Sequence, residues 1–321
     1  MTYNVLTQEQ VDFFLENGYV VIRDCFTQEQ ADWVLEDVWI RLNMEENDSS
    51  SWDVSRVLSV AEHGDSVLPR LKSNTLNMPS HRWFSPKEFA PKAWGAICDL
   101  LGGEDRIDEQ NSLWQDNMIV NFGGKKWEGD GWVRPRELDN WHVDGDTFLH
   151  FLDSREQGLL VTPIYSDEIQ PRGGGTMIAP DGISKVAKYL YDHAEGVRPG
   201  EFGAPDLMKE CNQFAEMTGR RGDVVLCHPL MLHSASRNAL RIPRFITNAK
   251  VKLKENFQFD RPEGELSLVE QKTLRALGMK PFSFVPTAPR QTLYPTREVV
   301  WDKIRAGEIA RIKTARNGTK M

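Results

Sequence analysis

The segment Gly222-Asp-Val-Val-Leu-Cys-His-Pro-Leu-Met-Leu-His233 is the clearest strand signal in this 321-residue chain. It is apolar, contains paired valines, opens on a glycine and ends on a histidine. A short apolar run bounded by a turn signal is typical of a buried strand. The segment therefore predicts a β core that carries an imidazole at the end of one of its strands.

Similar short apolar runs, separated by turns rich in glycine and proline, recur on both sides of that segment. They occupy residues 118–122, 147–152, 158–165, 176–179, 223–232 and 244–253. Many short strands joined in this way are typical of an all-β sandwich or barrel. We therefore predict a mainly β core with helices around it.

Helical patterns flank this core. Thr7-Gln-Glu-Gln10 and Thr27-Gln-Glu-Gln30 both have the form of a capping box, and apolar residues follow each of them at helical spacing, in the second case as far as Leu42. Further helices are predicted over residues 85–102, 183–193, 265–277 and 296–315.

We predict one domain spanning residues 1–321. Its helical N-terminal part extends to about residue 110, its β core covers about 114–255, and a helical extension covers about 256–321. No internal repeat or low-complexity tract divides the chain.

The composition, with 40% hydrophobic and 27% charged residues, is that of an ordinary soluble globular protein. The formal net charge of −8 offers no positive surface for nucleic acid or anionic lipid. No stretch is apolar enough to span a membrane, and the N-terminus lacks the pattern of a secretory leader. The 4 cysteines form no C-x-x-C pair, which fits reduced thiols. We therefore expect a cytoplasmic protein with a small-molecule substrate, while its oligomeric state stays open.

His142-Val-Asp144 places an imidazole and a carboxylate two residues apart, on the same face of an extended strand. His233 supplies a second imidazole. Two histidines and one carboxylate form the facial triad of non-haem Fe(II) oxygenases, which leaves coordination positions open for a co-substrate and dioxygen. Taken alone, an H-x-D pair is weak evidence for a metal site and is better explained as a hydrogen-bonded surface pair.

Arg244 favours the oxygenase interpretation. It lies eleven residues after His233, at the start of the next predicted strand. A guanidinium there could bind one carboxylate of a dicarboxylic acid in bidentate fashion while the other end of the acid chelates the metal. An iron site and an anion-binding arginine together suggest 2-oxoglutarate.

The chain resembles the phytanoyl-CoA dioxygenase family of Fe(II)/2-oxoglutarate-dependent oxygenases. Its opening LTQEQVDFFLENGYVVIRDCFTQEQADWV is similar to the family's N-terminal helix-strand-helix, and WHVDGD is similar to its H-x-D strand. RGGGTMIAPDGIS is similar to its glycine-rich strand and turn, and GDVVLCHPLMLHSASRNALRIPR to its distal-histidine strand. These pieces run from residue 6 to about residue 250 in the expected order. The resemblance implies a double-stranded β-helix, or jelly roll, with flanking helices.

The resemblance also implies roles for individual residues. It makes His142, Asp144 and His233 the iron ligands and Arg244 the partner of the distal carboxylate of 2-oxoglutarate. His228 is the other candidate for the third ligand, but His233 matches the family's spacing to the arginine.

Three further positions concern the co-substrate. Family members often carry a hydroxyl two residues after the distal histidine, where this chain has Ala235. Thr176, which ends a run of three glycines, is either the substitute donor or a structural turn residue. Asn121 matches the amide that in some relatives meets the metal-bound end of 2-oxoglutarate. The loop of residues 123–140 is long enough to form a lid.

The predicted activity is the oxidation of a C–H bond of a small metabolite by O2, with release of succinate and CO2. Hydroxylation is favoured, and halogenation is disfavoured because Asp144 fills the position that chloride would need. The family acts on fatty acyl thioesters, amino-acid-like osmolytes and many secondary metabolites, so the resemblance leaves the substrate open. Two other classes remain possible: a zinc-dependent hydrolase that uses the same three residues, and a non-catalytic jelly-roll binding protein.

Overall fold

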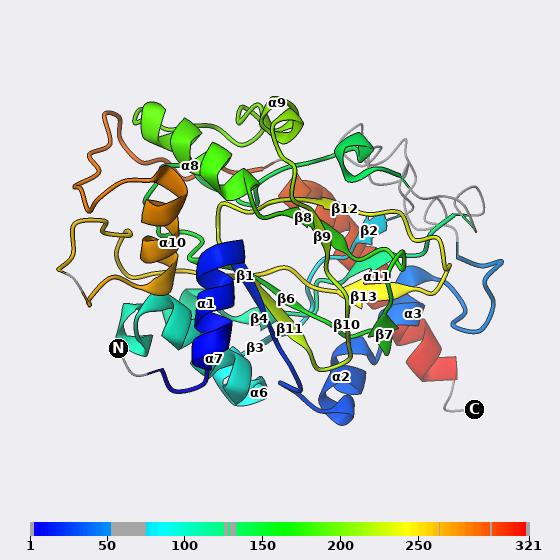
Figure 1. Ribbon diagram of the computed structural model, residues 1–321. Helices are drawn as coiled ribbons and strands as arrows, with labels where there is room; N and C mark the ends of the chain where they lie inside the picture. Colours follow the sequence, from blue (N-terminus) through cyan, green and yellow to red (C-terminus); the bar gives the residue numbers. More distant parts are fainter. Residues whose placement is uncertain are drawn as a thin grey trace.

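The chain folds into a core of several small antiparallel sheets with helices packed on two sides of it, in agreement with the predicted β core and flanking helices (Figure 1). The computed structural model describes residues 3–52, 75–124, 128, 133–262, 264–295 and 297–318. Nearly all of the buried hydrophobic side chains of these residues form one continuous core cluster, and Phe148, Leu149, Phe151 and Ala239 lie outside it. Of the helices described, none combines the length and the apolar composition that a bilayer crossing requires.

The largest of the described sheets has the strand order β1-β11-β6-β14, and every pairing in it is antiparallel. Every residue of β6 and β11 is buried, which agrees with their continuous apolar sequences. The four strands are Tyr19–Ile22 (β1), Val224–Cys227 (β11), Leu159–Pro163 (β6) and Ala249–Val251 (β14).

Two sheets of three strands complete the core, in the orders β12-β8-β9 and β13-β5-β2. Their strands are Leu232–Ala235 (β12), Thr176–Ala179 (β8), Ala215–Glu216 (β9), Arg244–Ile246 (β13), Ile119–Asn121 (β5) and Thr75–Asn77 (β2). Two further pairs are β10 (Gly219–Arg220) with β7 (Glu168–Ile169), and β3 (Trp83–Phe84) with β4 (Trp114–Gln115).

The predicted strand 223–232 is divided in the structure into β11 and the start of β12. Pro229 has no N–H to contribute to a ladder, and the N–H of Met231 donates to the carbonyl oxygen of His228 at 3.0 Å to close a turn. The break allows β11 to pair with β1 and β6 while β12 pairs with β8.

The predicted strand 244–253 is divided as well. β13 pairs with β5, whereas β14 pairs with β6, so the chain passes from one sheet to the other at Thr247 and Asn248. The hydrophobic pattern of the sequence continues through this transfer and does not mark it.

The helices begin largely where the capping signals predict. Both capping boxes form, with Thr7 accepting from the N–H of Gln10 and Thr27 from that of Gln30. The helices are Gln8–Asn17 (α1), Gln28–Leu35 (α2), Val38–Leu42 (α3), Pro86–Phe89 (α6), Pro91–Leu101 (α7), Gly182–Asp192 (α8), Ala204–Lys209 (α9), Leu268–Leu277 (α10) and Arg297–Gly318 (α11), with 3-10 turns at Glu104–Arg106, Glu109–Asn111 and Pro135–Glu137.

Two predicted helices are interrupted. The second one ends at Leu35 and resumes as α3, and residues 85–102 form α6 and α7 on either side of Ala90. Ala90 precedes a proline, and the proline ring disfavours helical backbone at the residue before it. Helices α1, α7, α8 and α10 gather on one side of the sheets and α3 and α11 on the other (Figure 1).

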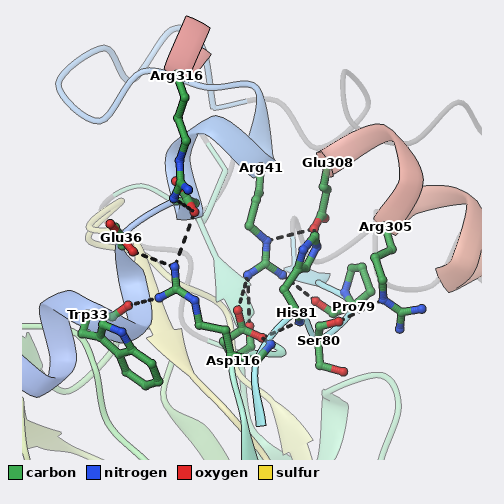
Figure 2. Close-up of polar contacts among 12 residues, drawn as sticks. Trp33, Glu36, Arg41, Pro79, Ser80, His81, Asp116, Arg305, Glu308 and Arg316 are labelled. Atoms are coloured by element: carbon green, nitrogen blue, oxygen red, sulfur yellow. Dashed lines mark hydrogen bonds and ion pairs between the residues drawn. The ribbon is translucent and has the colours of Figure 1, made fainter. Parts of the chain in front are cut away.

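A buried polar cluster attaches α11 to the N-terminal half of the chain (Figure 2). Arg41 donates from Nε to Glu308 at 2.8 Å and from Nη1 to Asp116 at 2.9 Å. His81 Nε2 lies 2.7 Å from the same oxygen of Glu308. The side chains of Arg41, Asp116 and Glu308 are at most 3% exposed, so each of these charges relies on the others for compensation.

Candidate metal centre and co-substrate site

His142 and His233 are held side by side by the backbone. His142 forms an isolated antiparallel bridge with His233 of β12, in which the backbone N–H of each residue donates to the carbonyl oxygen of the other at 3.0 Å. Directly paired residues of an antiparallel bridge project to the same face, and the two imidazole centroids lie 4.2 Å apart. Asp144 follows His142 by two residues and faces the same point.

The three side chains converge on one position. Asp144 Oδ1 lies 3.3 Å from His142 Nε2 and 3.5 Å from His233 Nε2. One ligand atom from each residue lies within 4.8 Å of the other two. Among the residues described, no other group of His, Cys, Asp and Glu side chains is arranged so that it could hold a metal ion. Ligand atoms bound at about 2.1 Å to a common ion lie roughly 3–3.5 Å apart. A small inward movement of the three side chains would therefore bring their ligand atoms to the separations that a divalent cation requires.

The backbone also selects the tautomer of each histidine. His142 Nδ1 lies 2.8 Å from the carbonyl oxygen of Asn140, and His233 Nδ1 lies 3.0 Å from that of Met231. A carbonyl oxygen only accepts, so both Nδ1 atoms carry the proton. Both Nε2 atoms are left with the lone pair that a metal ion needs.

The electrostatics of the cluster favour a cation. Burial raises the pKa of Asp144, but His233 and His142 outweigh this and hold that pKa well below its usual range. Burial lowers the pKa of His233, but Asp144 outweighs this and raises it. His233 Nε2 is buried and makes no hydrogen bond among the described residues. A buried nitrogen that makes no hydrogen bond and lies beside an ionised carboxylate fits a metal ligand.

His228 lies elsewhere. Its ring Nε2 is 3.0 Å from Thr273 Oγ1 on α10, and its backbone N–H donates to the carbonyl oxygen of Gly18. Burial lowers its pKa to about 3, with Lys272 as a smaller cause. His228 is therefore a neutral residue of the core, and the structure places His233 in the cluster instead.

Arg244 is 2% exposed and is fixed by backbone oxygens. Its Nε donates to Gly174 at 2.9 Å and its Nη1 to Ile119 at 3.4 Å. Its Nη2 makes no hydrogen bond within the part of the chain that the structure describes. Burial lowers its pKa to about 10, partly offset by Glu216. A buried guanidinium with a free nitrogen is suited to bind an anion.

Thr176 lies directly opposite Ala235 in the pairing of β8 with β12. Since paired residues share a face and alternate residues of a strand share a face, the side chains of Thr176, Ala235 and His233 project to the same side. The Thr176 hydroxyl makes no hydrogen bond among the residues described. The Thr176 hydroxyl therefore lies on the face where family members often carry a hydroxyl at the position of Ala235.

Asn121 lies opposite Arg244 in the pairing of β5 with β13. Its Nδ2 donates to the carbonyl oxygen of Ser236 at 2.9 Å, and its Oδ1 accepts from the N–H of Gly123 at 3.1 Å. Both ends of the amide are thus bonded to backbone. Residues 125–127 and 129–132 of the predicted lid lie outside the described residues.

The sequence interpretation missed Asn248. Its Nδ2 donates to Asp144 Oδ2 at 3.3 Å. The available signal was its position four residues after Arg244, because even spacing along an extended segment keeps two side chains on one face.

The C-terminal extension also returns to this region, which the sequence did not predict. Residues 147–152, predicted as a strand, make isolated bridges instead, one of them between Phe148 and Thr292. The N–H of Leu149 donates to the carbonyl oxygen of Gln291 at 2.9 Å. The extension therefore borders the segment that follows the H-x-D pair.

The sequence model of the phytanoyl-CoA dioxygenase (PhyH) family matches residues 14–245. By class the protein is therefore a non-haem Fe(II)- and 2-oxoglutarate-dependent oxygenase. The chain belongs to the phytanoyl-CoA dioxygenase family, which confirms the resemblance seen in its motifs.

Comparison with curated proteins finds no match. Similar solved structures include HygX from Streptomyces hygroscopicus with nickel, 2-oxoglutarate and hygromycin B bound (14% identity, 78% of this chain, 88% of that chain, TM-score 0.42). Another is EctD from S. alaskensis with 2-oxoglutarate and 5-hydroxyectoine (17% identity, 78% of each chain, TM-score 0.42). A third is the non-heme monooxygenase ThoJ in its apo form (11% identity, 97% of this chain, 98% of that chain, TM-score 0.43). The family assignment rests on the family model alone.

Proposed function

We propose that this protein oxidises, by hydroxylation, a C–H bond of a small metabolite, with His142, Asp144 and His233 as its Fe(II) ligands. The observation that carries the proposal is the convergence of two Nε2 atoms and one carboxylate oxygen, one from each residue, within 4.8 Å of one another. Both histidine tautomers are already set for metal binding by backbone carbonyls. When bound, iron supplies the oxidising chemistry with 2-oxoglutarate and O2, and the products include succinate and CO2.

In this proposal Arg244 and Thr176 bind the distal carboxylate of 2-oxoglutarate. Arg244 offers Nη2 from a guanidinium that two carbonyl oxygens hold in place. A dianion neutralises the positive charge that a divalent ion, one carboxylate and one guanidinium leave in a buried site. A zinc-dependent hydrolase has no use for a buried arginine so placed, which favours the oxygenase.

Trp141 and Leu138 help to exclude water beside the first ligand. Both side chains are buried, and Trp141 Nε1 donates to the carbonyl oxygen of Pro135 at 2.9 Å. This bond joins the two ends of the segment that precedes His142. We extend the proposal to the architecture: the sheets form a jelly-roll core, and residues 1–321 are one domain, as the single continuous core cluster supports.

The test is an anaerobic titration of metal-free protein with Fe(II) and 2-oxoglutarate, followed by the weak visible charge-transfer band of a chelated 2-oxo acid. We expect the band in the wild type. In Arg244→Gln we expect Fe(II) to bind as before but 2-oxoglutarate to bind about 30-fold or more weakly, because losing one partner of a buried charge pair costs about 2–5 kcal/mol. A wild type that forms no band and retains zinc would favour the hydrolase.

Thr176→Val removes a hydroxyl with little change of shape. We expect the affinity for 2-oxoglutarate to fall about tenfold or more, since a hydrogen bond to a charged group contributes about 1.5–3 kcal/mol. Adding Ala235→Ser to this variant should restore much of the affinity, because the two positions face each other across the strand pair. Unchanged affinity in Thr176→Val would assign Thr176 a structural role only.

A further inference from the structure

Asn248 occupies the break between β13 and β14, where the chain passes from one sheet to the other. Its side chain is half-buried, and its one hydrogen bond among the described residues goes from Nδ2 to Asp144 Oδ2, at 3.3 Å. The carboxylate only accepts, so the amide nitrogen is the donor. The contact joins two residues far apart in the chain at the proposed metal site.

The two oxygens of Asp144 have different partners. Oδ1 faces the Nε2 atoms of His142 and His233, at 3.3 Å and 3.5 Å, whereas Oδ2 faces Asn248. One oxygen is thus directed toward the metal position and the other is bound to an amide on the opposite side.

We propose that Asn248 is a positioning residue that keeps Asp144 a monodentate ligand, with Oδ1 toward the metal. This inference rests on the proposed function. A carboxylate rotates readily about its last side-chain torsion, and it can bind a cation through one oxygen or through both. Because the amide occupies Oδ2, that oxygen is kept from the metal.

This restriction matters for the co-substrate. With two histidines and one monodentate carboxylate, an octahedral ion keeps three positions, which serve a chelating 2-oxo acid and dioxygen. A bidentate Asp144 would occupy one of these positions. Asn248 thus protects the site that 2-oxoglutarate needs without touching either the metal or the co-substrate.

The position of the amide is itself well determined. Arg244 and Asn248 lie on the same short segment, and Arg244 is anchored by the carbonyl oxygens of Gly174 and Ile119. β14 holds the other end of the segment through its pairing with β6. Both ends of the segment are therefore fixed in sheets, and the amide can orient the carboxylate rather than follow it.

The test is Asn248→Leu, which keeps the approximate volume and removes the donor. We expect the Fe(II) affinity of the metal-free protein to fall about 10- to 100-fold in anaerobic titration, the usual loss for partners of metal ligands. We also expect a weaker charge-transfer band at saturating 2-oxoglutarate, and an unchanged unfolding midpoint of the metal-free protein. Asn248→Gln, which retains an amide, should recover part of the Fe(II) affinity.

Asn17→Leu is the matched control. Asn17 is also half-buried and makes one side-chain hydrogen bond, to the carbonyl oxygen of Phe13 on α1, away from the cluster. This variant should bind Fe(II) as the wild type does. Wild-type Fe(II) affinity and band intensity in Asn248→Leu would overturn the inference, as would a glutamine variant as weak as the leucine one. Failure of the wild type itself to bind Fe(II) would overturn the proposed function instead.

Discussion

Asp144→Ala is expected to abolish the anaerobic complex with Fe(II) and 2-oxoglutarate. The variant removes the one anionic ligand of the proposed site and leaves two imidazoles, of which that of His233 is buried. The loss of Fe(II) affinity should exceed the roughly 10- to 100-fold loss that follows removal of a partner of a ligand. The measurement is the titration of metal-free protein, with the bound iron quantified and the visible band recorded.

The control for this experiment is His228→Ala. His228 is fully buried but contacts Thr273 and the backbone around it rather than the cluster. This variant should lose stability, because it leaves a cavity and removes the acceptor of the Leu230 N–H, yet still bind Fe(II). Metal loss in His228→Ala together with metal retention in His233→Ala would reverse the proposed ligand set.

Glu308→Ala is expected to lower the free energy of unfolding by about 3–5 kcal/mol, the usual effect of removing one member of a buried ion pair. Arg41 would keep Asp116 as a partner, but its Nε would lose its acceptor in a side chain that is only 3% exposed to solvent. His81 would also lose the carboxylate oxygen that it contacts (Figure 2). Denaturant unfolding measures this change directly.

Asp302→Ala is the matched control on the same helix. Asp302 pairs with Arg305, but its side chain is 75% exposed, so solvent replaces the lost contact and stability should not change measurably. If Glu308→Ala unfolds like the wild type, the buried cluster does not hold α11 in place.

Local signals in the sequence predicted the parts of the fold that depend on neighbours in the chain. The capping boxes at Thr7 and Thr27 mark the starts of α1 and α2, because a cap needs only the first turn of its own helix. β8 spans the predicted residues 176–179, since its apolar run is bounded by glycine and proline. Strand partners and sheet membership depend on tertiary contacts, so the division of residues 244–253 was not predictable.

The same distinction between local sequence signals and tertiary contacts applies to the site. Histidine and aspartate at H-x-D spacing carry a chemical signature, and the structure brings His142, Asp144 and His233 together. Asn248 has no such signature, since an amide in a loop is common, and only the contact with Asp144 distinguishes it. Arg41 and Glu308 are separated by 267 positions, and nothing in either local sequence links them.

The late return of the C-terminal extension has a consequence for the order in which the protein is made. All three proposed ligands leave the ribosome before residues 291–293, which pair with residues 147–149 beside the H-x-D segment. Glu308, which attaches α11 to Arg41, follows later still. Until then the nascent chain exposes unpaired backbone groups next to the metal site, and such edges are templates for incorrect pairing. The surroundings of the site are thus completed only after residues 291–308 have been made.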